Sequence, residues 1–435
     1  MAIASPNTTA TTTSAPSTGQ SYGAPLATVT TLFFMWGFLT CLNDILVPHL
    51  KAIFDLNYTR VMLIQFAFFG AYFIFSIPSA KIIDWMGYQR SMVLGLLTMG
   101  VGAFLFVPAA SVPSYPLFLG ALIVLAAGIT CLQVAANPYV TVLGKPETAS
   151  SRLNLTQAFN SLGTFLAPFF GGLLILSSAP KTADQIRAMA PDAALAYRLH
   201  EAATVKMPYV GLGIALVLLA VAIGSFKLPK IEHAQHKVGE KVNDSIWRHP
   251  NLIFGAIAIF VYVGAEVSIG SFLVNYFAQP EIGGLTEKVA ASFVAFYWGG
   301  AMVGRFIGSA LLQKMKTGGL LGICAVCAAG LVAISMLTSG HFAMYSIILV
   351  GLFNSIMFPS IFTLGVAELG PLTGDGSGIM IMAIVGGAII PVAQGWIADH
   401  IGIHHAFFLP VICYVYILFF ALSGSKPNSE RYAKA

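Results

Sequence analysis

Charge is scarce in this sequence. Only 9% of its 435 residues are Asp, Glu, Lys or Arg, whereas a soluble globular protein carries about 25%. Hydrophobic residues account for 57% of the chain. A chain with so few charges cannot cover its apolar side chains with a water-soluble surface, so the composition identifies a protein that crosses a membrane several times.

The sequence also lacks the alternation of apolar and polar residues that strands of a membrane β-barrel require. Its apolar residues instead form continuous runs of about 20 residues, the length that a helix needs to cross the hydrocarbon core. We therefore predict an all-α membrane protein with twelve transmembrane helices. Their approximate bounds are 26–50, 59–83, 90–109, 116–141, 152–177, 207–226, 252–278, 288–313, 318–338, 342–366, 373–398 and 405–423.

Residue patterns of enzymes and metal sites are missing. The spans contain no Ser/His pair at a useful spacing, no cluster of His and Cys, and no glycine-rich loop beside a lysine that could hold a nucleotide. Cys324 and Cys327 have the spacing of a redox or zinc pair, but we interpret all five cysteines as buried free thiols. We expect no enzyme activity, metal or cofactor, and a gradient of an ion or of the solute as the energy source.

Basic residues are scattered through short loops, which argues against a nucleic-acid partner. Most of the 22 Lys and Arg lie on the side of the N-terminus, so the positive-inside rule places both termini in the cytoplasm, in a cell inner membrane. The longest charged linker divides the spans into two sets of six. The expected organisation is a disordered tail at 1–25, a six-helix bundle at 26–226, a cytoplasmic linker at 227–250, a second bundle at 251–424 and a cytoplasmic tail at 425–435.

A short loop motif repeats along the chain. Asp84, Gly87 and Arg90 follow the second span at three-residue spacing, and Arg305 lies near the end of the eighth span, six helices later. We interpret these four residues as a gating motif in a carrier whose repeats rock about a site near the membrane midplane. Asp375, which follows a loop on the same side, is expected to meet only water or Arg305.

The first span contains an acid, Asp44, inside an otherwise apolar run. An ionised carboxylate in hydrocarbon costs several kcal/mol unless water or a partner reaches it, so Asp44 is expected to face a polar path. The alternative is that it caps a helix end near Pro48. Thr40 lies on the same helical face, with Asn43 and Trp36 beside it. A carboxylate next to an aromatic ring suits a sugar, although Trp36 could equally belong to an interfacial aromatic belt.

Amide side chains gather in the fourth and fifth spans. Gln133 and Asn137 are one turn apart in the fourth, and Gln157 and Asn160 belong to a polar stripe in the fifth. Amides offer both donors and acceptors, so they suit an uncharged ligand with many hydroxyls. The competing interpretation is that they form hydrogen bonds between helices.

The seventh span contains the other acid within an apolar run, Glu266, with Tyr262 one turn before it. This arrangement mirrors the first span. It predicts that each bundle presents one acid to a shared cavity.

Four stretches of the sequence, 33–48, 135–144, 152–163 and 361–365, resemble the fucose:proton symporter family of the major facilitator superfamily. Thr40, Cys41 and residues 262–268 make the chain most similar to the glucose/galactose branch. The resemblance extends from about residue 30 to 420. It implies two six-helix bundles, alternating access and a central sugar site. It also implies that Asp44 is the sugar-binding acid and that Gln157 and Asn160 contact the sugar.

The sequence departs from this family at two positions. Fucose permeases resembling this chain carry a glutamate where it has Gln133, and a glutamine where it has Glu266. The coupling role of the fourth-helix acid cannot be transferred to an amide. Our hypothesis is that Asp44 or Glu266 carries that role.

The sequence as a whole predicts a secondary active transporter that takes up a hexose, glucose or galactose, by symport with a cation. The proton is the favoured cation, because a carboxyl group in a cavity of low dielectric constant can bind and release one. Sodium symport and uniport are alternatives, and a sugar sensor that no longer transports is a different class of hypothesis. The expected partners are a sugar, H+ or Na+, and the lipid bilayer, with the protein as a monomer.

Overall fold

The computed structural model describes residues 22–54, 58–112, 114–174, 185–186, 188–204, 206–229, 231 and 244–427. Within these ranges the side chains of 40, 42–54, 58–63, 65, 168–174, 198, 201–202, 204 and 287 are not described.

The first half of the chain forms long apolar helices. They are α1 (Gly23–Phe54), α2 (Tyr58–Ser111), α3 (Tyr115–Val142), α4 (Ala149–Leu174) and α7 (Lys206–Ser225), with the short elements η1 (Pro146–Thr148) and α6 (Pro191–Thr204) between them. α2 contains two of the predicted spans. They meet at Gly87, whose φ of +83° is not helical and interrupts the helix. Glycine is the residue that takes this backbone conformation at little cost.

The second half repeats this pattern with more breaks. Its elements are η3 (Ile246–Arg248), α8 (Pro250–Ala278), α9 (Glu287–Leu311), α10 (Thr317–Leu337), α11 (Gly340–Asn354), α12 (Met357–Gly365), η4 (Gly370–Leu372), α13 (Thr373–Met382), η5 (Ala383–Val385), α14 (Gly386–Ile401), α15 (Ile403–Ala406), α16 (Phe408–Phe419) and the π-helical η6 (Phe420–Gly424). α11 with α12, α13 with α14, and α15 with α16 make the last three spans.

The helices therefore account for the twelve predicted spans, and the prediction of an all-α membrane protein is confirmed. Nine helical stretches of the described residues are long and apolar enough to cross a membrane, and the longest of these, Phe66–Ser111, holds parts of two spans. Large apolar side chains such as Trp85 and Leu337 are 73% and 85% exposed. Exposed apolar side chains of this size fit a surface that faces lipid.

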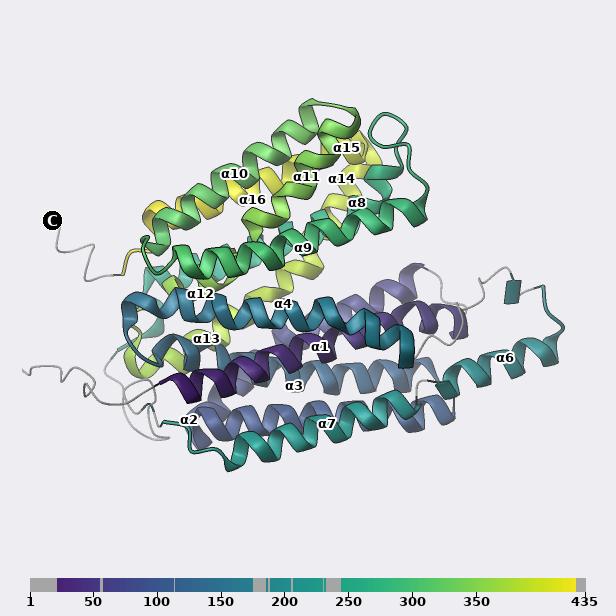
Figure 1. Ribbon diagram of the computed structural model, residues 1–435, viewed down its shortest axis with the longest axis horizontal. Helices are drawn as coiled ribbons and strands as arrows, with labels where there is room; N and C mark the ends of the chain where they lie inside the picture. The colour runs from purple at the N-terminus through teal and green to yellow at the C-terminus, as the bar shows by residue number, and fades with distance from the viewer. Residues whose placement is uncertain are drawn as a thin grey trace, which may run out of the picture.

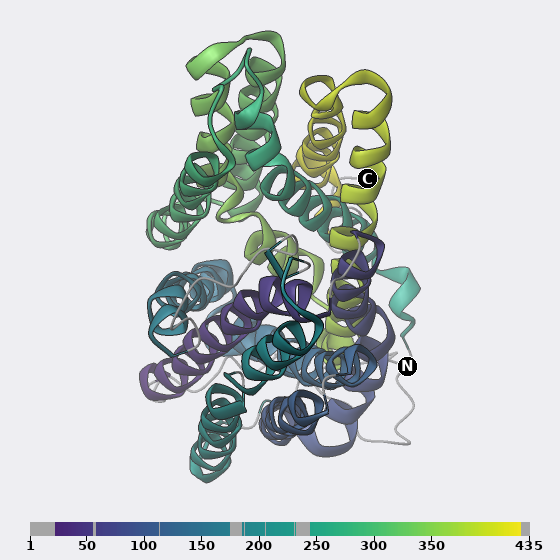
Figure 2. The same cartoon turned by 90° about the vertical axis from the view of Figure 1, so that its right-hand side faces the viewer.

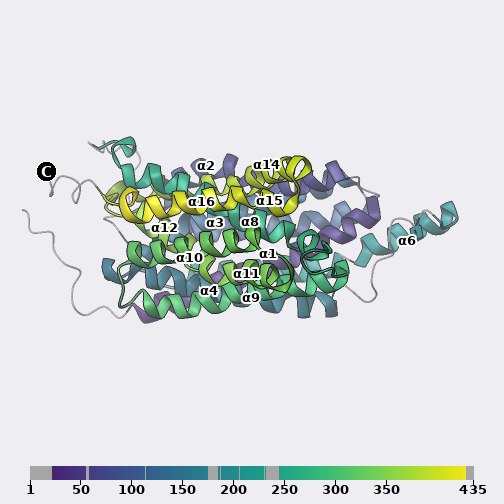
Figure 3. The ribbon, with the colours of Figure 1, turned by 90° about the horizontal axis from the view of Figure 1, so that it is seen from above.

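The twelve spans form two six-helix bundles. Figure 2 shows the purple to teal helices α1 to α7 on one side, here called the N-bundle, and the green to yellow helices from α8 onward on the other, the C-bundle. Figure 3 gives the same division from above. The start of α1 at Gly23 and the end of η6 at Gly424 lie at the same end of the molecule, which we call the terminal end (Figure 1).

Two glycines bring α1 and α4 into backbone contact. A Cβ added at Gly37 would collide with the carbonyl oxygen of Asn160, and one added at Gly163 would collide with that of Phe34. Only residues without a side chain allow this approach. The polar stripe of α4 is thereby held directly against α1, which carries the first predicted acid.

Candidate substrate and coupling site

The N-bundle places three of the predicted amides together. Gln133 and Asn137 of α3 and Gln157 of α4 are at most 6% exposed. Gln157 Nε2 donates to Asn137 Oδ1 at 3.4 Å, and Gln133 Nε2 donates to the hydroxyl of Tyr72 in α2 at 2.6 Å. Asn137 Nδ2 has no hydrogen-bond partner among the residues that the structure describes. A buried amide donor without a partner is costly, so this nitrogen is suited to a ligand that brings an acceptor.

The fourth amide, Asn160, holds α1 in place. Its Nδ2 donates to the carbonyl oxygen of Phe33 at 2.9 Å, and Thr164 Oγ1 donates to that of Gly37 at 3.3 Å. Trp36 lies on this part of α1, is 7% exposed and packs on Phe33 with ring centroids 5.3 Å apart. Trp36 is therefore buried within the protein, which does not fit the interfacial belt that was its alternative placement.

The predicted residues further along α1 are only partly described. Asn43 and Asp44 lie within the helix, which continues to Phe54. Their side chains and that of Thr40 lie outside the described residues. The roles assigned to these three residues stay predictions.

The C-bundle contains a cluster of phenols around one amide, which we call the tyrosine cluster: Tyr262, Tyr297, Asn354 and Tyr414. Asn354 Nδ2 donates to the Tyr297 hydroxyl at 2.8 Å, and the Tyr414 hydroxyl donates to Asn354 Oδ1 at 2.8 Å. The Tyr262 hydroxyl donates to the backbone oxygen of Asn354 at 3.0 Å. All four side chains are fully buried. The cluster ties α8, α9, α11 and α16 together.

Glu266 lies beside this cluster on α8. The Tyr297 hydroxyl reaches its backbone oxygen at 3.4 Å, and the positive charge of Arg305 acts on its carboxylate. Its Oε1 is buried and has no hydrogen-bond partner within the described part of the chain. Sequence reasoning placed Glu266 near Tyr262, and the structure does bring these two residues together.

Arg305 links the two bundles. It comes from α9, its Nε donates to the backbone oxygen of Ser355 at 3.2 Å, and its Nη1 donates to Ser161 Oγ of α4. Its own backbone oxygen accepts a hydrogen bond from Asn154 Nδ2 of α4 at 2.6 Å. One residue therefore connects the neighbourhood of Glu266 to the polar stripe of the N-bundle.

Further contacts join the bundles towards the terminal end. Ser151 Oγ donates to the Ser309 backbone oxygen at 2.7 Å, and Ser309 Oγ donates to that of Ser151 at 3.1 Å. Ser377 Oγ of α13 donates to the Val134 oxygen of α3 at 2.8 Å. The hydrogen bonds between the bundles described so far involve the first half of α4, α13 and the later part of α9.

The acids of the gating region pair differently from our expectation. The prediction that Asp375 meets only water or Arg305 is wrong, because its Oδ1 accepts a hydrogen bond from Lys81 Nζ of α2 at 2.7 Å. Lys81 also lies 3.6 Å from Asp84, which is the first residue of the predicted loop motif. Gly87 makes the turn after it, and Arg90 is exposed. The pair Lys81–Asp375 is a further link between the bundles.

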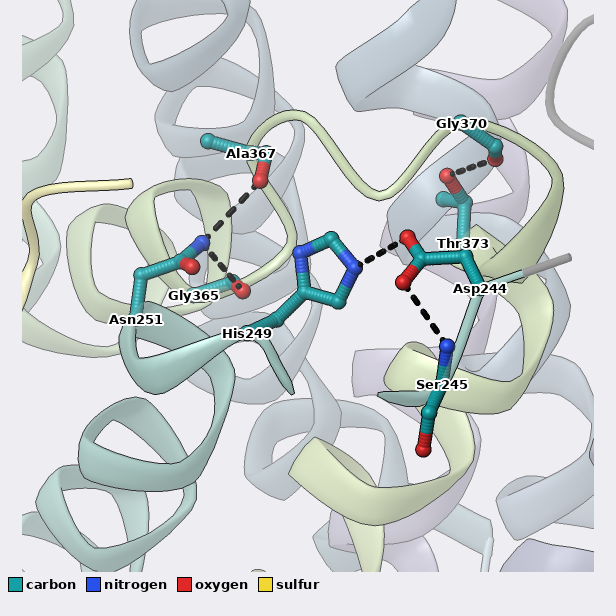
Figure 4. Close-up of polar contacts among 8 residues, drawn as sticks. All are labelled: Asp244, Ser245, His249, Asn251, Gly365, Ala367, Gly370 and Thr373. Atoms are coloured by element: carbon teal, nitrogen blue, oxygen red, sulfur yellow. Dashed lines mark hydrogen bonds and ion pairs between the residues drawn. The ribbon is translucent and has the colours of Figure 1, made fainter. Parts of the chain in front are cut away.

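The end of α12 is anchored by the start of α8. Asn251 Nδ2 donates to the carbonyl oxygens of Gly365 and Ala367 at 3.1 and 3.0 Å, at the end of α12 (Figure 4). Beside it, His249 Nε2 lies 2.7 Å from the carboxylate of Asp244. Asp244 also accepts a hydrogen bond from the backbone nitrogen of Ser245, and these hydrogen bonds lower the pKa of its carboxyl group.

The bundles are consequently joined at the terminal end and diverge towards the other end (Figure 1). Among the side chains that the structure describes, no hydrogen bond or ion pair joins the bundles beyond Ser161 towards the far end of α4. The described residues thus form a state in which the two bundles are joined at the terminal end. No three His, Cys, Asp or Glu side chains of the described part gather into a metal site.

Sequence reasoning missed several residues of these clusters. Tyr72 and Tyr414 are single hydroxyls in apolar runs, where tyrosine is also used for packing and for interfaces, so the sequence contains no signal that separates these uses. Lys81 and Asn251 lie at helix ends, where polar residues are ordinary. Ser161 belongs to the predicted polar stripe, but its partner in α9 is far away in sequence.

Comparison with known proteins agrees with this architecture. The family model described as Major Facilitator Superfamily matches residues 26–384. The chain belongs to the Major Facilitator Superfamily. It is an integral membrane protein with several membrane-spanning helices, and the predicted resemblance to the fucose:proton symporters of this superfamily is confirmed by the relatives described next.

Two relatives and one solved structure are similar over nearly the whole chain. A protein of Brucella abortus biovar 1 (strain 9-941) named glucose/galactose transporter is 54% identical over 94% of this chain and 96% of its own. The L-fucose-proton symporter of Escherichia coli (strain K12) is 37% identical over 92% of this chain and 93% of its own. The crystal structure of the transporter FucP in the outward conformation has a TM-score of 0.86 at 34% identity and covers 94% of this chain and 100% of that one.

Proposed function

We propose that this member of the Major Facilitator Superfamily takes up a hexose, glucose or galactose, together with a proton by alternating access. The observation that carries the proposal is the buried amide cluster of Gln133, Asn137 and Gln157, which is uncharged and includes an unpartnered donor. Uncharged groups that can donate and accept hydrogen bonds match a ligand made of hydroxyls. The name of the Brucella relative supports glucose and galactose as the substrates.

We assign sugar binding to this amide cluster together with α1. Asn137 and Gln157 bind hydroxyls directly, and Gln133 is positioned by Tyr72. Asp44 accepts hydrogen bonds from the sugar, while Asn43, Thr40 and Trp36 complete the α1 side. Asn160 contributes through its oxygen, because its nitrogen is committed to Phe33.

We assign proton coupling to Glu266, with Asp44 as the second acid. Glu266 is buried among phenols, faces the charge of Arg305 and has a carboxylate oxygen without a partner. When Glu266 is protonated, Arg305 loses the attraction of a negative charge that helps to hold it in the position from which it bonds Ser161. Proton binding is thereby coupled to the contact that joins the bundles.

The order of events follows from the contacts that join the two bundles at the terminal end. Sugar and proton enter from the opposite end, and the contacts Lys81–Asp375, Ser151–Ser309 and Arg305–Ser161 then open to release them. Arginine and lysine on the terminal side support a cytoplasmic location of both termini in a bacterial-type inner membrane. We further propose units at 26–226 and 251–424 joined by a cytoplasmic linker at 227–250, and a monomer as the working form.

The experiment is uptake of radiolabelled glucose into proteoliposomes with proton and sodium gradients imposed separately. Accumulation driven by the proton gradient alone supports the proposal. Accumulation that needs sodium, or equilibration without accumulation under both gradients, contradicts proton symport in favour of sodium symport or uniport. Asp44→Asn is expected to abolish accumulation, and undiminished uphill uptake in that variant would remove Asp44 from the site.

A further inference from the structure

The lipid-facing side of the C-bundle contains a groove that sugar transport does not use. It lies between α10 and α16, which run side by side (Figure 3), and has a volume of about 350 Å³. The residues that line it are Gly319, Gly322, Ile323, Val326, Cys327, Leu418 and Leu422. None of these side chains carries a charge, so the groove is suited to a hydrocarbon chain.

Glycines and a π-helix create the groove. A Cβ added at Gly319 would meet no atom within 4 Å, so the missing side chain leaves open space on the outer face of α10. α16 continues into the π-helix η6, which widens the last turn of the twelfth span beside Leu422. Short π-helical turns are rare in proteins, and those that occur are often at functional sites.

Positive charge gathers at one mouth of the groove. Gly318 packs against Ala421 and Ser425, so the start of α10 lies beside the end of η6 at the terminal end. Lys314 and Lys316, both exposed, come directly before α10. Backbone N–H groups of the first helical turn point towards the same mouth, and no side chain caps them.

No acid accompanies these lysines on the two helices. From residue 288 to 367 and from 400 to 429 the sequence contains no Asp or Glu. The mouth therefore attracts an anion at the depth where phospholipid phosphates lie, directly above an apolar groove.

We propose that the groove between α10 and α16 binds one acyl chain of an anionic phospholipid, whose phosphate is held by Lys314, Lys316 and the first turn of α10. A second copy of this chain fits less well. A two-fold contact through the same groove would bring the lysines of both copies together, and like charges repel. The proposal is independent of the identity of the transported sugar.

The test compares lipid retention by the full-length protein in detergent. The probes are dioleoylphosphatidylglycerol and dioleoylphosphatidylcholine, which have the same acyl chains and differ in charge. Native mass spectrometry should detect retained phosphatidylglycerol in preference to phosphatidylcholine, and phosphatidylglycerol should raise the unfolding temperature more. Equal retention of both lipids, or equal protection by inorganic phosphate alone, overturns the proposal.

Two sets of variants locate the lipid. Gly319→Leu fills the groove and is expected to remove most of the retained phosphatidylglycerol. Gly330→Leu is the matched control, since Gly330 is an exposed glycine of the same helix that also has open space around it and does not line the groove. Equal retention in these two variants contradicts the proposal, and a dimer that Gly319→Leu converts to a monomer with lipid retention unchanged would replace the lipid with a second copy.

The charges are tested separately from the groove. Replacing Lys314 and Lys316 with Gln should weaken phosphatidylglycerol retention about fivefold per lysine and leave phosphatidylcholine retention unchanged. Lys288→Gln, in the first turn of α9 at the other membrane surface, is the control and should have no effect. Unchanged phosphatidylglycerol retention in the double variant overturns the role of the lysines, and this result does not depend on how Gly319→Leu folds.

Discussion

The amide set of the N-bundle and the tyrosine cluster of the C-bundle differ in how their amides are hydrogen-bonded. In the N-bundle, the amides of Gln133, Asn137 and Gln157 form a loose set of hydrogen bonds that leaves Asn137 Nδ2 without a partner. In the C-bundle, both the nitrogen and the oxygen of the Asn354 side chain are bonded to phenols, and a third phenol bonds its backbone oxygen beside Glu266. Within the described residues, the amide set of the N-bundle thus leaves a buried donor unpaired, whereas the amide of the tyrosine cluster bonds helices of the C-bundle to one another.

The largest effect should come from Glu266→Gln, which removes the ionisable group of the C-bundle. The family resemblance implies that glutamine is tolerated at this position, so the variant should fold. If Glu266 carries the proton, the ratio of internal to external sugar should fall to about one, while exchange of labelled for unlabelled sugar continues. The measurement is accumulation and counterflow in the same proteoliposomes. Accumulation at the wild-type level would make Glu266 a structural residue.

A large effect on affinity is expected from Asn137→Ala in the N-bundle. It removes the unpartnered donor and the acceptor of Gln157, and we expect the apparent KM for glucose to rise about 5- to 150-fold. Thr130→Val on the same helix is the control, because the Thr130 hydroxyl bonds only to the local backbone oxygen of Ala126. A KM that changes equally in both variants would mean that Asn137 acts through the helix and not on the sugar.

Changes in the tyrosine cluster are expected to lower stability and to leave sugar affinity unchanged. Tyr414→Phe removes the donor to Asn354 Oδ1 and leaves a buried acceptor without a partner, which costs about 1–3 kcal/mol of stability. We expect a lower unfolding temperature and an unchanged KM for sugar. Tyr416 lies on the same helix, and its hydroxyl donates to the backbone oxygen of Phe254 at 3.3 Å. Tyr416→Phe should therefore have a smaller effect. A variant that loses affinity and keeps its stability would show that the cluster belongs to the binding site.

The smallest effect is expected at Asp244, in the segment that precedes α8. The hydrogen bonds from His249 and Ser245 lower the pKa of Asp244, so this carboxylate stabilises the folded state at pH values above its ordinary pKa of about 3.9. That contribution is lost as the pH falls through the lowered value. The wild type should lose slightly more thermal stability than Asp244→Asn when the pH is lowered from 7 to 3. Parallel pH profiles would show that the interaction contributes nothing, as is common for exposed pairs.

The sequence predicted the elements of the site better than their connections. Gln133 and Asn137 were chosen as candidates because amides one turn apart share a helical face, and Gln157 because it belongs to a polar stripe of its own helix; both are local properties. Tyr72 and Tyr414 were not identified, because a hydroxyl in an apolar run gives no sign of its partner. The pairing of Lys81 with Asp375, 294 residues apart, depends on how the bundles meet. Periodicity along one helix contains no information about that contact.

The reciprocal hydrogen bonds of Ser151 and Ser309 have a consequence for the speed of the carrier. Each is a neutral hydroxyl-to-carbonyl bond, and such a bond contributes about 1 kcal/mol because water can replace it. Thermal motion can therefore break these two bonds within a transport cycle. Water that enters then forms hydrogen bonds with the serine hydroxyls and the backbone oxygens that have lost their partners. Ser151→Ala or Ser309→Ala, which removes one of these hydroxyls, would make a small change in how long the empty carrier stays open to each side of the membrane.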